Sequence, residues 1–188
     1  LLTHEMTFIT VPKNNLKNIN QIFLNCEIEI EKLISQTFAL GVELLNTQEL
    51  QSGSILINLG LKKISLGLFK NLALVHSVTL PIGIDHITND ISKVCSLNLE
   101  ESLAIRNIID FSFKNNHDLF DENKFLRKNF FIDSKFRKIS EDLIFKIIKA
   151  RTDEIFEMLK KQLTLTGFNF NSGTNLFLTG EGSNLTNI

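Results

Sequence analysis

Arg151 is the residue whose position most clearly requires a chemical partner. It lies in a segment from Ser140 to about Leu163 in which apolar residues recur on one face at helical spacing. That face consists of Ile144, Ile147, Ile148, Ile155, Met158 and Leu159. Arg151 falls in the middle of the face, where an arginine either pairs with a carboxylate or belongs to a recognition surface. An intramolecular ion pair, snorkelling at the edge of the core and a binding role all stay open.

Further basic residues lie near Arg151 in the sequence. Lys146 and Lys149 stand in the same segment, and the cluster Lys135, Arg137 and Lys138 precedes it. An apolar groove with a basic rim binds acidic, amphipathic peptides, and these residues could supply such a rim. A solvated loop is the simpler interpretation of the 135–138 cluster.

Other familiar chemistry is missing from the sequence. The 4 histidines are scattered, and neither a Gly-x-Ser-x-Gly elbow nor a His-Glu-x-x-His helix occurs. Cys26 and Cys95 lack zinc-type spacing and stand among apolar residues, which predicts buried free thiols in a reducing compartment. The net charge of −1 gives no general attraction to nucleic acid, and we expect no nucleic-acid partner. No run is long and apolar enough to span a bilayer.

The elements that position these residues follow from hydrophobic periodicity. Short connections at 60–63 and 70–72 predict an antiparallel meander of three strands, at 55–59, 64–69 and 74–80. Helices are predicted at 36–45, at 83–94, from Asn98 with Glu101 at capping-box spacing, and over the long segment from Ser140. A final strand at 176–179 leads into the turn Gly180-Glu181-Gly182-Ser183.

The first third of the chain is less regular. Met6 to Val11 predicts a strand closed by Pro12, and 14–26 predicts an amphipathic helix. A short alternating run follows at Ile28, Ile30 and Leu33, and the polar stretch 46–54 predicts a loop. Residues 114–135 have no clear assignment, and 171–173 predict a turn.

This order of elements matches one lobe of the actin and heat-shock-chaperone ATPase fold. Within that superfamily, Thr79-Leu80-Pro81-Ile82-Gly83-Ile84-Asp85-His86-Ile87-Thr88-Asn89-Asp90-Ile91 resembles a segment of the bacterial cell-division family FtsA. In that segment a strand ends in Pro, a glycine turn follows and a Thr-x-Asp-Ile helix begins. Leu99 to Arg106 resembles the family's Leu-Glu-Glu-Ala-Glu-x-x-Lys helix, and Leu176 to Gly180 resembles its Leu-Thr-Gly-Gly turn. The similarity covers nearly all 188 residues.

The resemblance implies an α/β, actin-like (ribonuclease-H-like) lobe. A mixed sheet flanked by helices would be joined to a smaller helical α+β subdomain. Residues 1–80 and 165–188 would form the inner subdomain, with 1–12 as the end of a preceding subdomain, and 81–164 would form the outer one. Residues 25–45 would supply the first strand and helix of the lobe. The chain would be the second lobe of a longer protein.

The resemblance also places a nucleotide site, in which the family's turn Asp-Ile-Gly-Gly-Gly-Thr approaches the phosphates. Here the matching run is Asn58-Leu59-Gly60-Leu61-Lys62-Lys63. Only Gly60 is retained, and the amide of Asn58 is a poorer magnesium ligand than a carboxylate. Lys62 and Lys63 could attract phosphate as flexible charges, but an exposed hairpin tip is the simpler interpretation.

Two further family contacts with the nucleotide are altered. Leu103 stands where the family helix has Glu, and Arg106 stands where it has Lys. In the terminal turn Gly180 is retained, Glu181 takes the place of a second glycine, and Ser183 fits the pattern. Together the changes predict that ATP with magnesium binds weakly or not at all, with at most a very weak ATPase activity.

The resemblance also gives Arg151 a role. The family's Ile-Ile-x-x-Arg helix helps to bind the acidic, apolar C-terminal peptide of FtsZ, and Ile147-Ile148-Lys149-Ala150-Arg151 fits that pattern. The implied protein is a scaffold of the divisome that self-associates and links the FtsZ ring to the membrane through a segment absent here. It would work in the cytoplasm, at the cytoplasmic face of the inner membrane at the division septum. A working actin-like ATPase of a pilus-assembly or chaperone-like type, or a sugar-kinase-like enzyme, are the alternatives.

Overall fold

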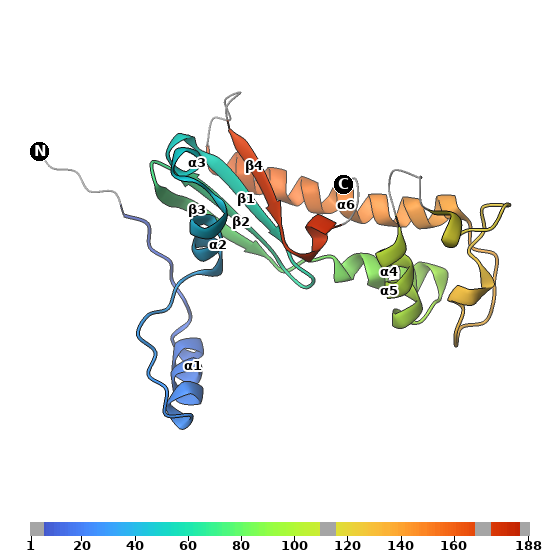
Figure 1. Ribbon diagram of the computed structural model, residues 1–188, viewed down its shortest axis with the longest axis horizontal. Helices are drawn as coiled ribbons and strands as arrows, with labels where there is room; N and C mark the ends of the chain where they lie inside the picture. The colour runs from blue at the N-terminus through green and yellow to red at the C-terminus, as the bar shows by residue number, and fades with distance from the viewer. Residues whose placement is uncertain (1–5, 110–115, 168–173, 185–188) are drawn as a thin grey trace, which may run out of the picture.

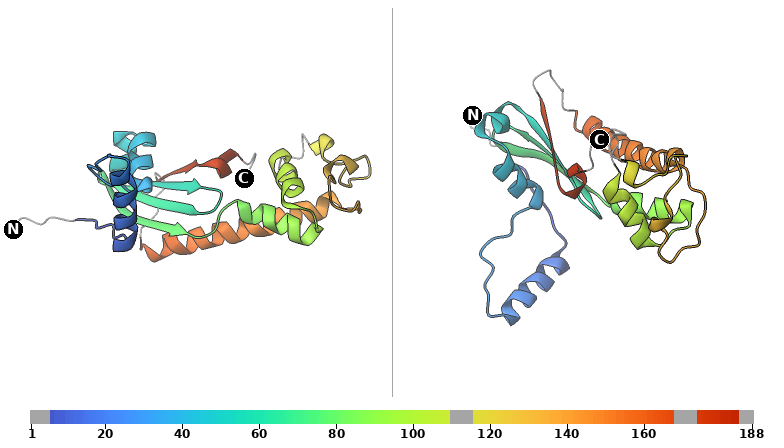
Figure 2. Two further views of the ribbon diagram at one scale, coloured as in Figure 1. Left: turned by 90° about the horizontal axis from the view of Figure 1, so that it is seen from below. Right: turned by 45° about the vertical axis from the view of Figure 1, so that its right-hand side comes forward.

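The computed structural model describes residues 6–109, 116–167 and 174–184, so the turn predicted at 171–173 lies outside the described residues. The helices are α1 (Lys13–Asn25), α2 (Gln36–Leu44), α3 (Thr47–Ser52), α4 (Asp85–Cys95), α5 (Leu99–Ile108) and α6 (Glu141–Leu165). The strands are β1 (Ser54–Leu59), β2 (Ile64–Lys70), β3 (Ala73–Leu80) and β4 (Asn175–Thr179). Short 3-10 turns are η1 (Asn116–Asp118), η2 (Lys128–Phe130) and η3 (Glu181–Asn184). The sheet lies toward one end of the molecule and α4 and α5 toward the other, and α6 runs along both (Figure 1, Figure 2).

The sheet is mixed, and its strand order is β3-β2-β1-β4. β1 pairs antiparallel with β2, and β2 pairs antiparallel with β3, which confirms the predicted meander. β4 pairs parallel with β1 and places Thr179 opposite Asn58. Parallel strands end at the same edge of a sheet, so the segments after β1 and β4 emerge side by side.

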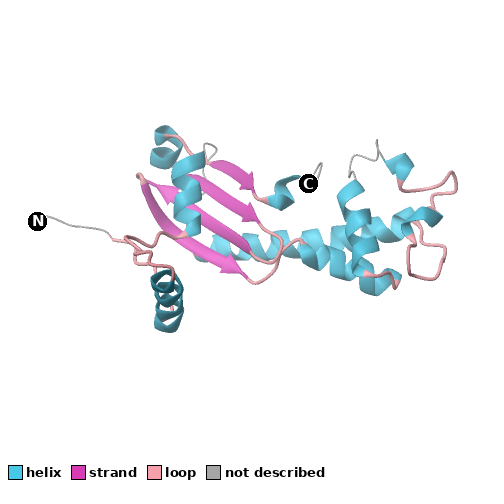
Figure 3. Ribbon diagram, turned by 60° about the horizontal axis from the view of Figure 1, so that its bottom comes forward, coloured by secondary structure: helices cyan, strands magenta, loops and turns pink. Residues whose placement is uncertain are grey.

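Apolar side chains cover both faces of the sheet. On one face Ile55 and Ile57 belong to the same buried cluster as Ile148 and Ile155 of α6. The opposite face packs against α2 and α3, as the helix crossing the sheet in Figure 3 shows. Because β1 is covered on both sides, its sequence is a nearly continuous apolar run.

Side-chain caps determine where several helices begin. Asn98 and Glu101 form the predicted capping box of α5, and the hydroxyl of Ser140 accepts from the Leu143 amide at the start of α6. The loop predicted at 46–54 is wrong over most of its length. Asn46 and Glu49 form a second capping box there, which initiates α3.

The N-terminal part departs most from the predictions. Residues 6–12 have no regular secondary structure, so the strand predicted from Met6 to Val11 is wrong, and the alternating run at Ile28 to Leu33 forms no strand either. Within the described part of the chain no strand pairs with either segment, and an isolated strand is not stable. The helix predicted at 14–26 is present as α1 and stands apart from the sheet, with none of its residues buried (Figure 1).

The two thiols differ in environment. Cys95 is buried, as predicted, at the end of α4, and burial raises the pKa of its thiol. Cys26 is exposed just after α1, so its predicted burial is wrong. The reason is that α1 covers no apolar surface in which this side chain could be enclosed.

The outer region from α4 to α6 shares its core with the sheet. One cluster of buried side chains extends from β1 through α4 and α5 to the segment 119–139 and α6. The division into an inner subdomain (1–80 and 165–188) and an outer subdomain (81–164) stays a prediction. All four strands fall in the first of these and α4, α5 and α6 almost entirely in the second.

Candidate functional site

Three turns pack together at the edge where β1 and β4 end. The turn after β1 receives two hydrogen bonds from the start of α4, from Ile84 N to Gly60 O at 3.1 Å and from Asp85 N to Leu61 O at 2.9 Å. A Cβ on Gly83 would lie 2.2 Å from the Leu61 carbonyl oxygen, so the turn between β3 and α4 fits only without a side chain.

Gly180 packs equally tightly on the other side of this edge. Its φ is +88°, and a Cβ there would lie 2.3 Å from Asn58 Oδ1 and 2.7 Å from the Leu59 carbonyl oxygen. The Ser183 hydroxyl donates to Gly180 O at 2.6 Å and closes the turn η3. The structure therefore brings Asn58, Gly60, Gly180 and Ser183 to one edge of the sheet.

Three of the charged residues predicted at this edge are exposed, and the fourth is buried in an ion pair. Lys62, Lys63 and Glu181 are exposed, and no ion pair is found for them in the part of the chain that the structure describes. Arg106 is only 8% exposed and is already engaged, because its Nη1 lies 3.3 Å from Asp85 Oδ1. It joins the end of α5 to the first turn of α4.

These residues fit a magnesium nucleotide poorly. Asn58 offers a neutral amide where a metal prefers a carboxylate. The two amides at the start of α4 donate to Gly60 and Leu61, whereas phosphate binding at a helix N-terminus needs free amides. Among the described residues, no group of three or more His, Cys, Asp or Glu is arranged to hold a metal ion. The arrangement favours packing of the turns over phosphate chemistry.

A second candidate site is a groove between α4 and α6, which we call the α4–α6 groove. It has a cavity volume of about 370 Å³ and is lined by Asp90, Val94, Lys146, Ile147, Ala150, Arg151 and Glu154. Helical spacing explains this set, because residues three and four apart share a face of α6. The groove combines apolar walls with charges of both signs.

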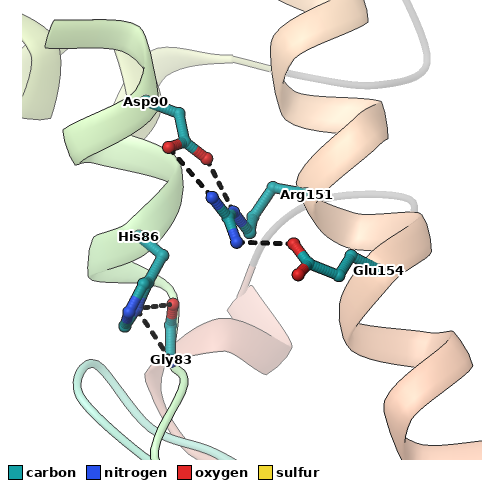
Figure 4. Close-up of polar contacts among 5 residues, drawn as sticks. All are labelled: Gly83, His86, Asp90, Arg151 and Glu154. Atoms are coloured by element: carbon teal, nitrogen blue, oxygen red, sulfur yellow. Dashed lines mark hydrogen bonds and ion pairs between the residues drawn. The ribbon is translucent and has the colours of Figure 1, made fainter. Parts of the chain in front are cut away.

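Arg151 is held in the groove by two carboxylates (Figure 4). Its Nε lies 2.6 Å from Asp90 Oδ2 and its Nη2 lies 3.0 Å from Asp90 Oδ1, while Nη1 pairs with Glu154. The hydrogen bonds to Asp90 raise the pKa of Arg151 above its ordinary value, against the effect of burial. The intramolecular ion pair left open by the sequence is confirmed.

The other predicted basic residues lie around the groove. Lys146 lines it and forms an exposed pair with Asp142 at 2.7 Å, whereas Lys149 is exposed and is not part of the lining. Lys135, Arg137 and Lys138 are exposed in the segment before α6. The Ser134 Oγ, just before this segment, accepts from the Asn98 amide at 3.2 Å, so the segment begins near the end of α4, where Val94 lines the groove.

Three acidic residues that make specific contacts in the outer region were not singled out as site residues from the sequence. Glu154 could have been inferred, because it stands three residues after Arg151 on the same helix. Asp90 lies 61 positions away in the sequence and carried no signal of this partner. Glu101 was expected only to cap α5, but it also binds the segment 132–134. His86 hydrogen-bonds at the turn before α4, with its Nδ1 3.2 Å from Gly83 N (Figure 4).

Comparison with known proteins supports the resemblance seen in the sequence. No family model matches the chain. It is 23% identical to the cell division protein FtsA of Agrobacterium fabrum over 188 residues, all of this chain and 42% of that protein. It is 26% identical to FtsA of Bacillus subtilis over 163 residues, 87% of this chain and 36% of that protein. The chain therefore spans about two fifths of the length of the curated relatives that it matches.

Solved structures give the fold. MreB 5 of Spiroplasma citri bound to AMPPNP superimposes with a TM-score of 0.69 at 16% identity, covering 95% of this chain and 56% of that one. A chain of the PilM–PilN type IV pilus biogenesis complex gives 0.60 at 14% identity, covering 92% and 42%. The predicted α/β, actin-like fold with a mixed sheet is confirmed, and so is the resemblance to FtsA over the whole chain.

Proposed function

We propose, from the similarity to FtsA along the whole chain, that this actin-like protein is a cell-division scaffold whose α4–α6 groove binds the C-terminal peptide of FtsZ. The groove is the observation that carries the proposal. It offers apolar contacts from Val94, Ile147 and Ala150, with the cations of Lys146 and Arg151 beside them. An acidic, apolar peptide in helical form matches such a surface.

The charges within the groove limit how the peptide binds. Both strong contacts of Arg151 go to Asp90 and Glu154, so a peptide carboxylate must share this guanidinium instead of finding it free. Lys146 is easier to recruit, because its pair with Asp142 is exposed and contributes little to stability. We therefore assign the first electrostatic contact to Lys146 and the orientation of the peptide to Arg151.

The proposal is tested by fluorescence anisotropy with a labelled FtsZ C-terminal peptide and the full-length protein. Ala150→Glu fills the groove and adds a negative charge at an exposed helical position without removing any ion pair. It should weaken binding at least tenfold, and Lys146→Glu should weaken it about fivefold. Lys161→Glu is the matched control, because Lys161 is exposed on the same helix outside the groove. Unchanged affinity in both groove variants rejects the proposal.

Arg151→Glu, which would follow from the sequence alone, is a less specific test. The substitution would place three carboxylates together in place of the Arg151 ion pairs with Asp90 and Glu154. Repulsion between them would destabilise the packing of α4 on α6, so loss of binding could come from unfolding. Variants at positions 146 and 150 avoid this ambiguity.

We further propose that ATP with magnesium plays a reduced role. The neutral Asn58, the bulky Leu61 and the anionic Glu181 at the sheet edge support weak binding or none. Isothermal titration of the full-length protein should find no micromolar affinity, and Asn58→Asp combined with Leu61→Gly and Glu181→Gly should increase affinity. Micromolar binding with turnover in the unmodified protein would instead favour the working ATPase of the alternative interpretation.

The wider role is also a proposal. Self-association and attachment of the FtsZ ring to the inner membrane would place the protein at the cytoplasmic face of the division site. In the described part of this chain no helix has both the length and the apolar character needed to cross a bilayer. From the resemblance to FtsA we propose that a segment outside this chain attaches the protein to the membrane, which sedimentation of the full-length protein with anionic vesicles would test.

A further inference from the structure

Glu101 is a buried carboxylate that makes more contacts than capping a helix requires. It is 1% exposed, and its Oε2 accepts from the Asn98 amide at 2.9 Å, as a capping box demands. Its Oε1 accepts from three successive amides, of Ile132, Asp133 and Ser134, at 2.7, 2.9 and 3.0 Å. The Ser134 hydroxyl donates to Oε2 as well. The carboxylate therefore joins α5 to a segment more than 30 positions away.

These contacts keep the carboxylate charged. Burial alone would raise the pKa of Glu101, but the hydrogen bonds from Ser134, Asn98 and Asp133 lower it to about 2. No cation forms an ion pair with Glu101 among the described residues, so hydrogen-bond donors alone balance its charge. Three amides converging on one oxygen fix the backbone at 132–134 in one conformation.

The segment that Glu101 fixes leads directly into the basic residues before α6. We call residues 135–138 the basic arm. Across 124–138 the sequence has six basic residues and one acidic residue, Asp133, giving 6 − 1 = +5. Asp133 is itself engaged, because the Asn98 side-chain amide lies 3.3 Å from its Oδ2. Phe136 in the arm is 50% exposed and stacks edge-to-face on Phe131.

The basic arm lies close to the α4–α6 groove. Ser134, just before the arm, accepts a hydrogen bond through its Oγ from the Asn98 amide at 3.2 Å. Asn98 lies four residues after Val94, which lines the groove at the end of α4. An acidic peptide that fills the groove and continues past the end of α4 would meet the arm. The exposed cations there complement its charge, whereas Arg151 inside the groove is already shared with two carboxylates.

We infer that Glu101 is a positioning residue for the binding of acidic peptides, because it fixes the turn 132–134 and so holds the basic arm beside the α4–α6 groove. The inference rests on the proposed function and adds a second part to the same site. Glu101 itself touches no ligand. Its effect on binding must therefore act through the arm.

A double-mutant cycle tests this dependence. Glu101→Gln keeps the shape of the side chain but removes its charge, and Glu100→Gln is the matched control at an exposed neighbouring position. In the full-length protein Glu101→Gln should weaken binding of the FtsZ C-terminal peptide about tenfold, and Glu100→Gln less than twofold. When Lys135, Arg137 and Lys138 are all changed to Ala, Glu101→Gln should have less than a twofold further effect. An equal effect in both backgrounds, or none in either, overturns the inference.

Hydrogen exchange separates this inference from the proposed function. Exchange of the amides at 132–134 should accelerate more than tenfold in Glu101→Gln and stay unchanged in Glu100→Gln. If the unmodified protein binds no peptide, the proposed function fails, and unaltered exchange would show separately that Glu101 does not fix this turn. If Glu101→Gln does not fold, Ser134→Ala removes one donor only, and it should give a smaller effect that again disappears when the arm is neutral.

Discussion

The two ends of the molecule use polar residues in opposite ways. At the sheet edge the three turns are held by glycine packing and backbone hydrogen bonds, and the charges of Lys62, Lys63 and Glu181 are exposed. Between the outer helices, charged side chains are engaged in specific pairs such as Arg151 with Asp90. The sheet edge is thus held mainly by backbone contacts, whereas the outer region has a defined polar network. This contrast supports the proposals that the outer region binds a partner and that ATP plays a reduced role at the sheet edge.

The largest expected effect is a loss of stability in acid caused by Glu101. Its pKa is about 2 when folded and 4.5 ordinarily, so its contribution is fully present above pH 4.5 and is lost as the pH falls towards 2. A shift of this size corresponds to about 3 kcal/mol at 1.36 kcal/mol per unit. Urea unfolding between pH 7 and 3 should show most of this loss, and Glu101→Gln should be less stable at pH 7 but less sensitive to acid. Equal acid sensitivity in both proteins would contradict the assignment.

Gly180→Ala should destabilise the sheet edge by more than about 2 kcal/mol. The substitution combines an unfavourable positive φ with a Cβ placed 2.7 Å from a backbone carbonyl oxygen. Gly167→Ala is the matched control, because Gly167 also has a positive φ, of +63°, but nothing lies within 4 Å of the added atom. It should cost only about 1 kcal/mol, the cost of the backbone conformation alone. Equal losses in thermal or urea unfolding would mean that the turns are not packed as described.

Asp90→Ala should cost about 2 kcal/mol, because it leaves the partly buried guanidinium of Arg151 without its bidentate acceptor. Adding Arg151→Leu should recover part of that loss, since an unpaired charge no longer remains. A coupling free energy near zero in urea unfolding would show that the two helices are not joined by this pair.

The smallest effect is expected at the exposed pair of Lys146 and Asp142. Both side chains are 73% exposed, so Asp142→Ala should change the free energy of unfolding by less than about 0.5 kcal/mol. The same variant frees Lys146 and should strengthen peptide binding slightly. A large loss of stability at neutral pH would show that the surface of α6 is more tightly coupled than its exposure implies.

Most of the fold could be predicted from local patterns. The meander followed from three apolar runs with short connections, and α5 and α6 followed from the caps at Asn98 and Ser140. The strands expected at Met6–Val11 and Ile28–Leu33 failed, because a strand depends on a neighbour that no local pattern specifies. The loop expected at 46–54 failed because its polar composition concealed the capping box of Asn46 and Glu49.

The candidate site was less predictable than the fold. The need of Arg151 for a carboxylate could be read from its place in an apolar face, but the choice of Asp90 depends on how α4 packs against α6. Arg106 matched a family pattern, yet the structure engages it with Asp85. The second role of Glu101 required the position of 132–134, a segment without recognisable periodicity.

The most direct test of the account is a methyl and amide NMR titration of the protein with the FtsZ C-terminal peptide. The account predicts saturable shifts at Val94, Ile147 and Ala150 and in the basic arm, residues 135–138, with little change around Gly60 and Gly180. Shifts confined to the sheet edge, or none at millimolar peptide, would contradict it.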